Sequence, residues 1–271
     1  MKKLSNHTLV YDNDCPMCDL YTNGFIKAGM LDENGRVMYG CARVPASFDN
    51  ERARNEIALV DYENGTVTYG IDSLVKVLGH SYPWIVRVAQ FWPVKQFLDV
   101  LYSFISYNRK VIAPPGEFER RGSCTPAYHA GYRIAYILFA WLITSWALAS
   151  YATHLHPLIP TTTFGREFII CGGQILFQLV FVRFMTRDRL MHYIGNMMTV
   201  SLIGALLLLP MLIAGSIATI SNPWIFSIWF MLVVTFMLTI HWKRTQMLGI
   251  SWLASVTWIL YRVIVLWIVL P

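Results

Sequence analysis

The fold of this chain is decided at residues 8–18, which read Thr8-Leu9-Val10-Tyr11-Asp12-Asn13-Asp14-Cys15-Pro16-Met17-Cys18. The short apolar run at the start predicts a buried strand, and the acidic turn after it ends that strand. Residues 19–30 can then form a helix. Two thiols spaced this way at the start of a helix can close a disulfide with little backbone movement, and the helix N-terminus favours a thiolate on the first. We therefore expect redox chemistry at this pair.

Further elements follow in an alternating order. Strands are expected at 37–41, 57–61 and 66–70, and Asn64-Gly65 is a strong hairpin signal between the last two. A short helix is expected over 46–55, and another up to Gly79, capped by Asp72 or Ser73. The order β-α-β-(α)-β-β-α is that of thioredoxin, with the two cysteines at the thioredoxin position. The fold class predicted for this half is an α/β thioredoxin-like domain.

A family resemblance covers residues 7–126. Its segments are Val10–Cys18, Gly70–Leu74, Asp99–Tyr102, Asn108-Arg109 and Cys124-Thr125-Pro126. Together they resemble the DCC family of thiol-disulfide oxidoreductase-like proteins, which implies a thioredoxin-like domain that exchanges disulfides through its Cys-x-x-Cys pair. Many thioredoxin-like proteins carry a proline just before the third strand, facing the disulfide. This chain has Arg54-Asn55-Glu56 there.

The two thiols are expected to have different roles. The first thiol of a Cys-x-x-Cys pair is usually the more exposed and the more acidic, so we assign Cys15 as the attacking thiolate and Cys18 as the resolving thiol. Pro16 suits the first helical turn, where its missing N–H would have no partner. Asp12 and Asp14 are expected to tune the acidity of Cys15, in one of two ways. A carboxylate near Cys15 raises its pKa, whereas Asp12 buried beneath the motif can accept the thiol proton.

A metal site is the alternative that the pair leaves open. One Cys-x-x-Cys is half of a zinc site, and Cys41 and Cys124 could complete it. Residues 1–128 hold no second Cys-x-x-Cys and no spaced His pair, so we expect no bound metal and no cofactor beyond a redox-active Cys15–Cys18 disulfide. Cys124 is also a candidate relay thiol. Cys41 and Cys171 are expected to be packing residues.

Charge and hydropathy divide the chain in two. Mean hydropathy is +0.45 and only 14% of residues are charged, too apolar for an ordinary soluble protein. Basic and acidic residues balance over 1–128, so the whole net charge of +6 belongs to 129–271. The charge therefore relates to membrane topology, and no nucleic-acid partner is expected. The N-terminal residues 1–12 contain no apolar stretch typical of a signal peptide, so we expect the first half to stay in the cytoplasm.

Five apolar segments are each long enough to cross a bilayer, at about 20 residues per span. They lie at approximately 130–151, 164–184, 191–215, 223–240 and 251–270. The predicted architecture is thus a domain at 1–112, a linker at 113–129 and an all-α transmembrane bundle of about five helices at 130–271. The domain includes two trailing helices in the apolar stretch 81–112, divided by Pro83 and Pro93. These can pack on the sheet or lie on the membrane surface, and we favour packing.

Basic residues alternate between the connections of the spans. They lie before or at the start of the first span, between the second and third, and between the fourth and fifth: Arg120, Arg121, Arg133, Arg183, Arg187, Arg189, Lys243 and Arg244. The connections 153–163 and 216–222 contain no Lys or Arg. The positive-inside rule then predicts a multi-pass protein of the plasma (inner) membrane, with a cytoplasmic N-terminal domain and the C-terminus outside.

Polar residues inside the spans are candidates for function or for helix pairing. Arg262 lies near the middle of the fifth span, and Glu167, Gln174 and Gln178 of the second span are its expected partners, either as an intramembrane site or as a structural pair. Three histidines are expected near the cytoplasmic face, where they could ligate haem or a metal, although ordinary interfacial histidines are the commoner case: His129, His192 and His241.

Two functions remain open at this stage. The first is a membrane-anchored thiol-disulfide oxidoreductase that reduces or exchanges disulfides of a protein or small-molecule substrate on the cytoplasmic face. The second is a non-catalytic multi-pass membrane protein, transporter-like or an assembly factor, whose thioredoxin-like domain is a redox sensor or docking module. The lipid bilayer is a partner in both, and the sequence does not specify an oligomeric state.

Overall fold

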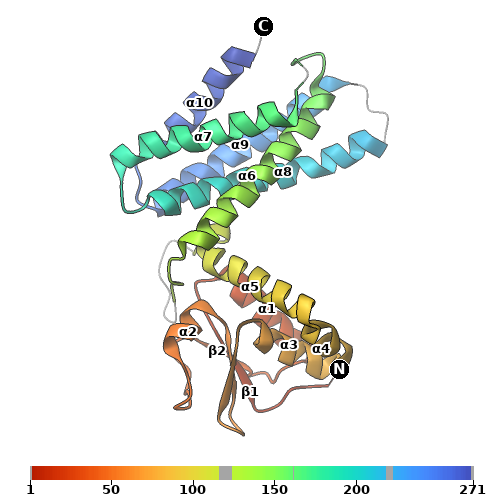
Figure 1. Cartoon of the computed structure of the whole chain (residues 1–271), viewed down its shortest axis with the longest axis vertical. Coiled ribbons are helices and arrows are strands. Elements are labelled where there is room, and N and C mark those ends of the chain that lie inside the picture. The colour runs from red at the N-terminus through yellow and green to blue at the C-terminus, as the bar shows by residue number, and fades with distance from the viewer. Residues whose placement is uncertain (1, 116–123, 161, 218–221, 270–271) are drawn as a thin grey trace. The chain divides into compact units, whose positions relative to one another are not determined.

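The computed structural model describes residues 2–115, 124–160, 162–217 and 222–269 (Figure 1). The chain divides into two compact units, residues 1–132 and residues 133–271. The first contains a small mixed sheet with helices, and the second is helical.

The sheet of the first unit has four strands in the order β2-β1-β3-β4. Strand β1 is parallel to β2 and antiparallel to β3, and β3 is antiparallel to β4. Parallel pairing of β1 and β2 needs a crossover, which helix α1 supplies, whereas β3 and β4 are joined by the tight turn at Asn64-Gly65. The strands are β1 His7–Tyr11, β2 Arg36–Met38, β3 Ala58–Asp61 and β4 Thr66–Tyr69.

Five helices accompany this sheet: α1 Pro16–Lys27, α2 Asn50–Asn55, α3 Gly70–Ser81, α4 Pro83–Gln90 and α5 Trp92–Ile112. Both faces of the central strands are buried. Leu9 and Leu59 pack on one face with side chains of α1, α3 and α5, while Val10 and Val60 pack on the other with Ala53 of α2. Alternate residues of β1 and β3 therefore point into two cores, which is why these strands read as continuous apolar runs.

Two helix starts differ from the expectation. Helix α1 begins at Pro16 rather than at Asp19, so Cys18 lies in its first turn. Neither Asp72 nor Ser73 caps α3, because that helix already begins at Gly70. The Ser73 hydroxyl instead donates to the carbonyl of Thr68 at 2.6 Å, tying the helix to the end of β4.

The second unit carries most of the apolar helices. Among the described residues, four helices are long and apolar enough to cross a membrane: α6 Ala130–Ala152, α7 Phe164–Met185, α8 Leu190–Ile217 and α9 Pro223–Met247. The fifth expected span is the shorter helix α10, Leu253–Val269, of 17 residues. At 1.5 Å per residue its described part is about 25 Å long, slightly less than the roughly 30 Å of a hydrocarbon core.

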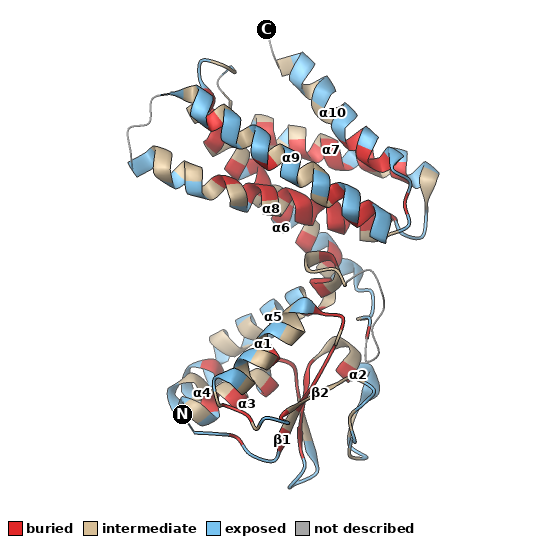
Figure 2. Ribbon diagram, turned by 180° about the vertical axis from the view of Figure 1, so that it is seen from behind, coloured by how far each residue is buried: buried red, intermediate tan, exposed pale blue. Residues whose placement is uncertain are grey.

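Small residues let these helices approach closely. A Cβ atom added to Gly172 of α7 would clash with the Trp141 ring of α6, and one added to Gly204 of α8 would clash with Met237 of α9. Buried positions run along α8, where Ile194 and Met197 belong to the unit's main apolar cluster (Figure 2). Close backbone approach through glycine is a common way for helices to associate in lipid.

Candidate functional site

The Cys-x-x-Cys pair lies at the junction between β1 and α1. Cys15 is the N-cap of α1, and its Sγ accepts a hydrogen bond from the backbone N–H of Cys18 at 3.4 Å. Pro16 occupies the first helical turn, as expected. Both cysteines are free thiols in this structure. The sulfur of Cys15 thus faces the unpaired N–H groups of a helix N-terminus, where negative charge is favoured.

The two thiols differ in acidity in the expected direction. A hydrogen bond from the Cys18 side chain lowers the pKa of Cys15 to about 7, and the Cys18 backbone N–H and the positive charge of Arg109 act in the same direction against the effect of burial. The pKa of Cys18 is raised, first by this same hydrogen bond and then by burial. Cys15 is therefore the more acidic thiol of the pair.

Exposure contradicts the expectation that Cys15 is the more accessible thiol. Cys15 is only 1% exposed, whereas Cys18 is half-buried. Both line a cavity of about 230 Å³ between β1, α1, α2 and α5. Its wall is mostly apolar and includes Tyr21 and Tyr102. A reacting partner therefore has to enter this cavity to reach the Cys15 sulfur.

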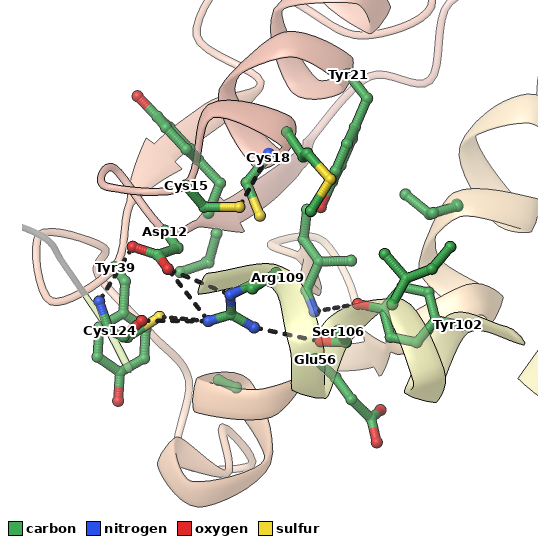
Figure 3. A pocket seen from close by; sticks show the side chains of 17 residues that line it. Asp12, Cys15, Cys18, Tyr21, Tyr39, Glu56, Tyr102, Ser106, Arg109 and Cys124 are labelled. Atoms are coloured by element: carbon green, nitrogen blue, oxygen red, sulfur yellow. Dashed lines mark hydrogen bonds and ion pairs between the residues drawn. The ribbon is translucent and has the colours of Figure 1, made fainter. Parts of the chain in front are cut away.

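A buried ion pair lies beside the cysteines. Asp12 Oδ2 accepts from Arg109 Nε at 3.3 Å and Nη2 at 3.2 Å (Figure 3). Lys110 Nζ lies 3.4 Å from the same oxygen. The side chains of Asp12 and Arg109 are 2% and 7% exposed. The other oxygen of Asp12 accepts the backbone N–H of Asp14 at 3.1 Å. Asp12 is thus a paired carboxylate. Its charge opposes the Cys15 thiolate, while that of Arg109 favours it.

Arg109 also organises the backbone around the cavity. Its guanidinium donates to the carbonyls of Arg54 at 2.9 Å and Asn55 at 3.4 Å, the segment that stands where thioredoxin-like proteins often have a proline. The hydroxyl of Ser106, one helical turn earlier, bonds to the same Asn55 carbonyl. One side chain of α5 therefore joins the strand end at Asp12 to the segment that precedes β3.

Cys124 lies in the same cluster, although it follows α5 in a segment expected to be a linker. Its N–H donates to Asp12 Oδ1 at 3.2 Å, and its carbonyl and sulfur each lie 3.3 Å from Arg109 Nη2. Burial raises the pKa of Cys124 to about 11 despite the nearby Arg109. The N–H of Ala127 donates to Asn55 Oδ1 at 2.8 Å. The described part of the expected linker thus belongs to the first unit, which extends to Tyr132.

Some predicted site residues are brought together and others are not. Asp12, Cys15, Cys18 and Cys124 share the cavity lining, and Asp14 is buried beside it. Sequence reasoning missed Arg109 as a site residue, although Asn108-Arg109 was one of the segments of the family resemblance. Cys41 is exposed, so the expectation that it is a packing residue is wrong, and it is not part of this lining. Among the described residues, no group of three His, Cys, Asp or Glu side chains is placed to hold a metal.

The polar residues expected to pair inside the membrane have separate partners. Glu167 pairs with Arg166 at 3.2 Å, and the Arg262 guanidinium lies over the Trp258 ring at 5.7 Å. Gln178 accepts from Tyr193 at 3.0 Å and Thr257 at 3.2 Å. Gln174 is buried on the same helix. The Gln178 contacts join α7 to α8 and α10, and Arg262 and Glu167 do not pair in the described part of the chain.

The three histidines likewise do not form one cluster. His129 packs on Tyr107 and Tyr132 in the first unit. His241 lies in the second unit, where its ring nitrogens are 3.1 Å from the Tyr193 hydroxyl and 3.0 Å from the Ser255 hydroxyl. His192 is in α8 of the same unit.

Comparisons with known proteins add no identification. No family model matches the chain, and neither a curated protein nor a solved structure matches it. The function has to be inferred from the site itself.

Proposed function

We propose that this protein is a membrane-anchored thiol-disulfide oxidoreductase that acts through Cys15 and Cys18 of a thioredoxin-like domain. One observation carries the proposal: the first thiol of a Cys-x-x-Cys pair caps a helix, has a pKa lowered to about 7, and lines a cavity together with its partner thiol. Near neutral pH about half of such a thiol is the reactive thiolate. A pKa close to the ambient pH also gives a thiol its highest exchange rate.

The fold supports the same proposal. A parallel β1–α1–β2 unit followed by the antiparallel β3–β4 pair and α3 has the element order of thioredoxin, with the cysteines between β1 and α1.

The exchange requires two substitutions at sulfur. The Cys15 thiolate attacks one sulfur of a substrate disulfide, a mixed disulfide forms, and the other substrate sulfur leaves as a thiolate. Cys18 then loses its proton and attacks the Cys15 sulfur, which releases the second substrate thiolate and forms the Cys15–Cys18 disulfide. Two electrons pass from the protein to the substrate. A cytosolic dithiol or glutathione-type thiol must reduce the protein again.

Burial of Cys15 favours a small substrate. The sulfur is reached through a cavity of about 230 Å³ with a mostly apolar wall. A low-molecular-weight disulfide can enter such a space, whereas a disulfide on the surface of a folded protein would need the cavity to open. We therefore propose that small disulfides react faster than protein disulfides.

A position of this activity at a bilayer is supported by the apolar helices of the second unit. Four helices of the described chain are able to span it. The alternating basic connections support a cytoplasmic position for the first unit. In that compartment reduction of the substrate is the favoured direction.

The experiment measures turnover of oxidised glutathione by the full chain in detergent micelles, with dithiothreitol as the electron donor and the rate without protein subtracted. Cys15→Ser is expected to abolish this catalysed turnover. Cys18→Ser, incubated with oxidised glutathione in the absence of dithiothreitol, is expected to accumulate a mixed disulfide of Cys15 with glutathione, detected by mass. The matched control is Cys41→Ser, which changes an exposed thiol outside the cavity. Unchanged turnover in Cys15→Ser would refute the proposal.

A further inference from the structure

Helices α4 and α5 expose large apolar side chains to solvent. Phe97 is 65% exposed and Trp92 is 70% exposed. We call the set the α4–α5 apolar surface, and it consists of Trp84, Val88, Phe91, Trp92, Phe97, Val100, Leu101 and Ile105. Single exposed apolar residues are normal on soluble proteins, but a contiguous set marks an interaction site.

Helical spacing arranges these residues in two rows, one along α4 and one along α5. Trp84 and Val88 are four residues apart on α4, and Phe97, Leu101 and Ile105 repeat every four residues on α5. Residues four apart lie on one helix face. Exposed positions follow α4 and α5 on the side away from the sheet (Figure 2).

The opposite face of α5 already has partners. The Tyr102 hydroxyl accepts the backbone N–H of Ile57 at 2.8 Å, and Arg109 binds Asp12. Packing on the domain therefore accounts only for the inner faces of these helices. Packing on the sheet and lying on a membrane surface are compatible, because one face of a helix can pack on the domain while the opposite face contacts lipid.

Lys95 of α5 pairs with Asp72 at 2.7 Å and with Asp99 at 3.6 Å, while Arg87 of α4 is exposed. Burial of the eight apolar side chains is therefore the main attraction that this surface offers a partner. Two tryptophans and two phenylalanines among eight residues match the composition of helices that lie at the lipid interface.

The α4–α5 apolar surface is joined by a short connection to the first candidate membrane span. Helix α5 ends at Ile112 and the first candidate span begins at Ala130. Even fully extended, this connection reaches only about 60 Å. Contact between the α4–α5 apolar surface and lipid is thus an intramolecular event with a high effective concentration, so weak apolar insertion is sufficient.

We propose that the α4–α5 apolar surface rests on the lipid bilayer, with its aromatic side chains inserted among the acyl-chain ends. Because burial of apolar side chains carries the contact, binding does not require anionic lipid and persists at high salt. The inference is independent of the thiol chemistry, since it uses neither Cys15 nor Cys18.

Photocrosslinking of the full chain in phosphatidylcholine vesicles tests this inference. Phe97 is replaced by p-benzoylphenylalanine, an aromatic of similar shape, and the adducts are identified by mass after illumination. The matched control places the same group at Tyr62, an exposed aromatic residue just after β3. We expect a phospholipid adduct at position 97, at least about tenfold more abundant than at position 62, in both low and high salt.

A second variant checks that the contact depends on the surface. Val88→Gln combined with Val100→Gln removes apolar area at exposed positions, where folding is little affected. It is expected to reduce the lipid adduct at position 97 several-fold while oxidised-glutathione turnover is kept. The inference is overturned by adducts at position 97 to another polypeptide or to the chain's own membrane helices, by equal lipid adducts at position 62, or by no adduct at all.

Discussion

The substitution Asp12→Asn removes one charge from the buried cluster and little else. Asparagine keeps an oxygen that can accept the N–H groups of Asp14 and Cys124, as Oδ1 does at 3.1 and 3.2 Å. Its amide nitrogen would replace the oxygen that faces Arg109 and Lys110. The change therefore places a donor against two cations and leaves their charge without a buried partner.

The cost follows from burial. The Asp12 and Arg109 side chains are 2% and 7% exposed, and removing one member of a buried pair typically lowers the free energy of unfolding by about 3–5 kcal/mol. Because about 1.4 kcal/mol is a factor of ten, exchange through global opening should accelerate by about 2 to 3.5 orders of magnitude. Loss of the Asp12 charge, which raises the pKa of Cys15 in the native protein, should also shift that pKa below about 7.

Hydrogen exchange of the β3 amides in the full chain measures this cost, since Leu59 and Val60 are fully buried in a central strand. The control is Asp19→Asn. Asp19 pairs with Arg36 at a shorter distance, 2.8 Å, but is 51% exposed, so we expect a loss of about 1 kcal/mol or less. If Asp12→Asn accelerates exchange no more than Asp19→Asn does, the assignment of the buried cluster as a major stabilising contact is wrong.

Three further outcomes are expected. Alkylation of Cys15 by iodoacetamide should rise with pH to half its maximum near pH 7, because the thiolate forms as pH passes its pKa, while Cys124, with a pKa of about 11, stays unmodified on peptide mapping at pH 7.5. Tyr102→Phe leaves the backbone N–H just before β3 without its acceptor, and chemical denaturation should show a loss of about 1–3 kcal/mol. Gly172→Val forces the Trp141 ring out of its place between α6 and α7. We expect this variant to aggregate at a lower temperature in micelles than the control Gly165→Val, which changes a glycine at an open position.

Local sequence signals were sufficient for much of the fold. The apolar run before Asp12, the Asn64-Gly65 turn and the Cys-x-x-Cys spacing each act within a few residues. The strands form close to where these signals place them, and α1 begins three residues before the expected start. The start of α3 was wrong because Asp72 and Ser73 are typical caps in isolation, whereas the chain already turns into the helix at Gly70, with a φ of +64°. The sequence does not predict the burial of Cys15 either, because the exposure of its side chain depends on segments that are distant in the sequence and cover it in the fold.

The sequence by itself determined that two thiols stand at the start of a helix after a strand, and that apolar segments of membrane length follow. Periodicity and spacing carry this information, because backbone preference and burial pattern are local properties. Only the tertiary structure decided what surrounds the thiols. Asp12 and Arg109 are far apart in sequence, and Cys124 lies beyond a helix, yet all three meet beside Cys15. A buried carboxylate needs a buried cation, and which cation can reach it depends on how α5 packs against the sheet.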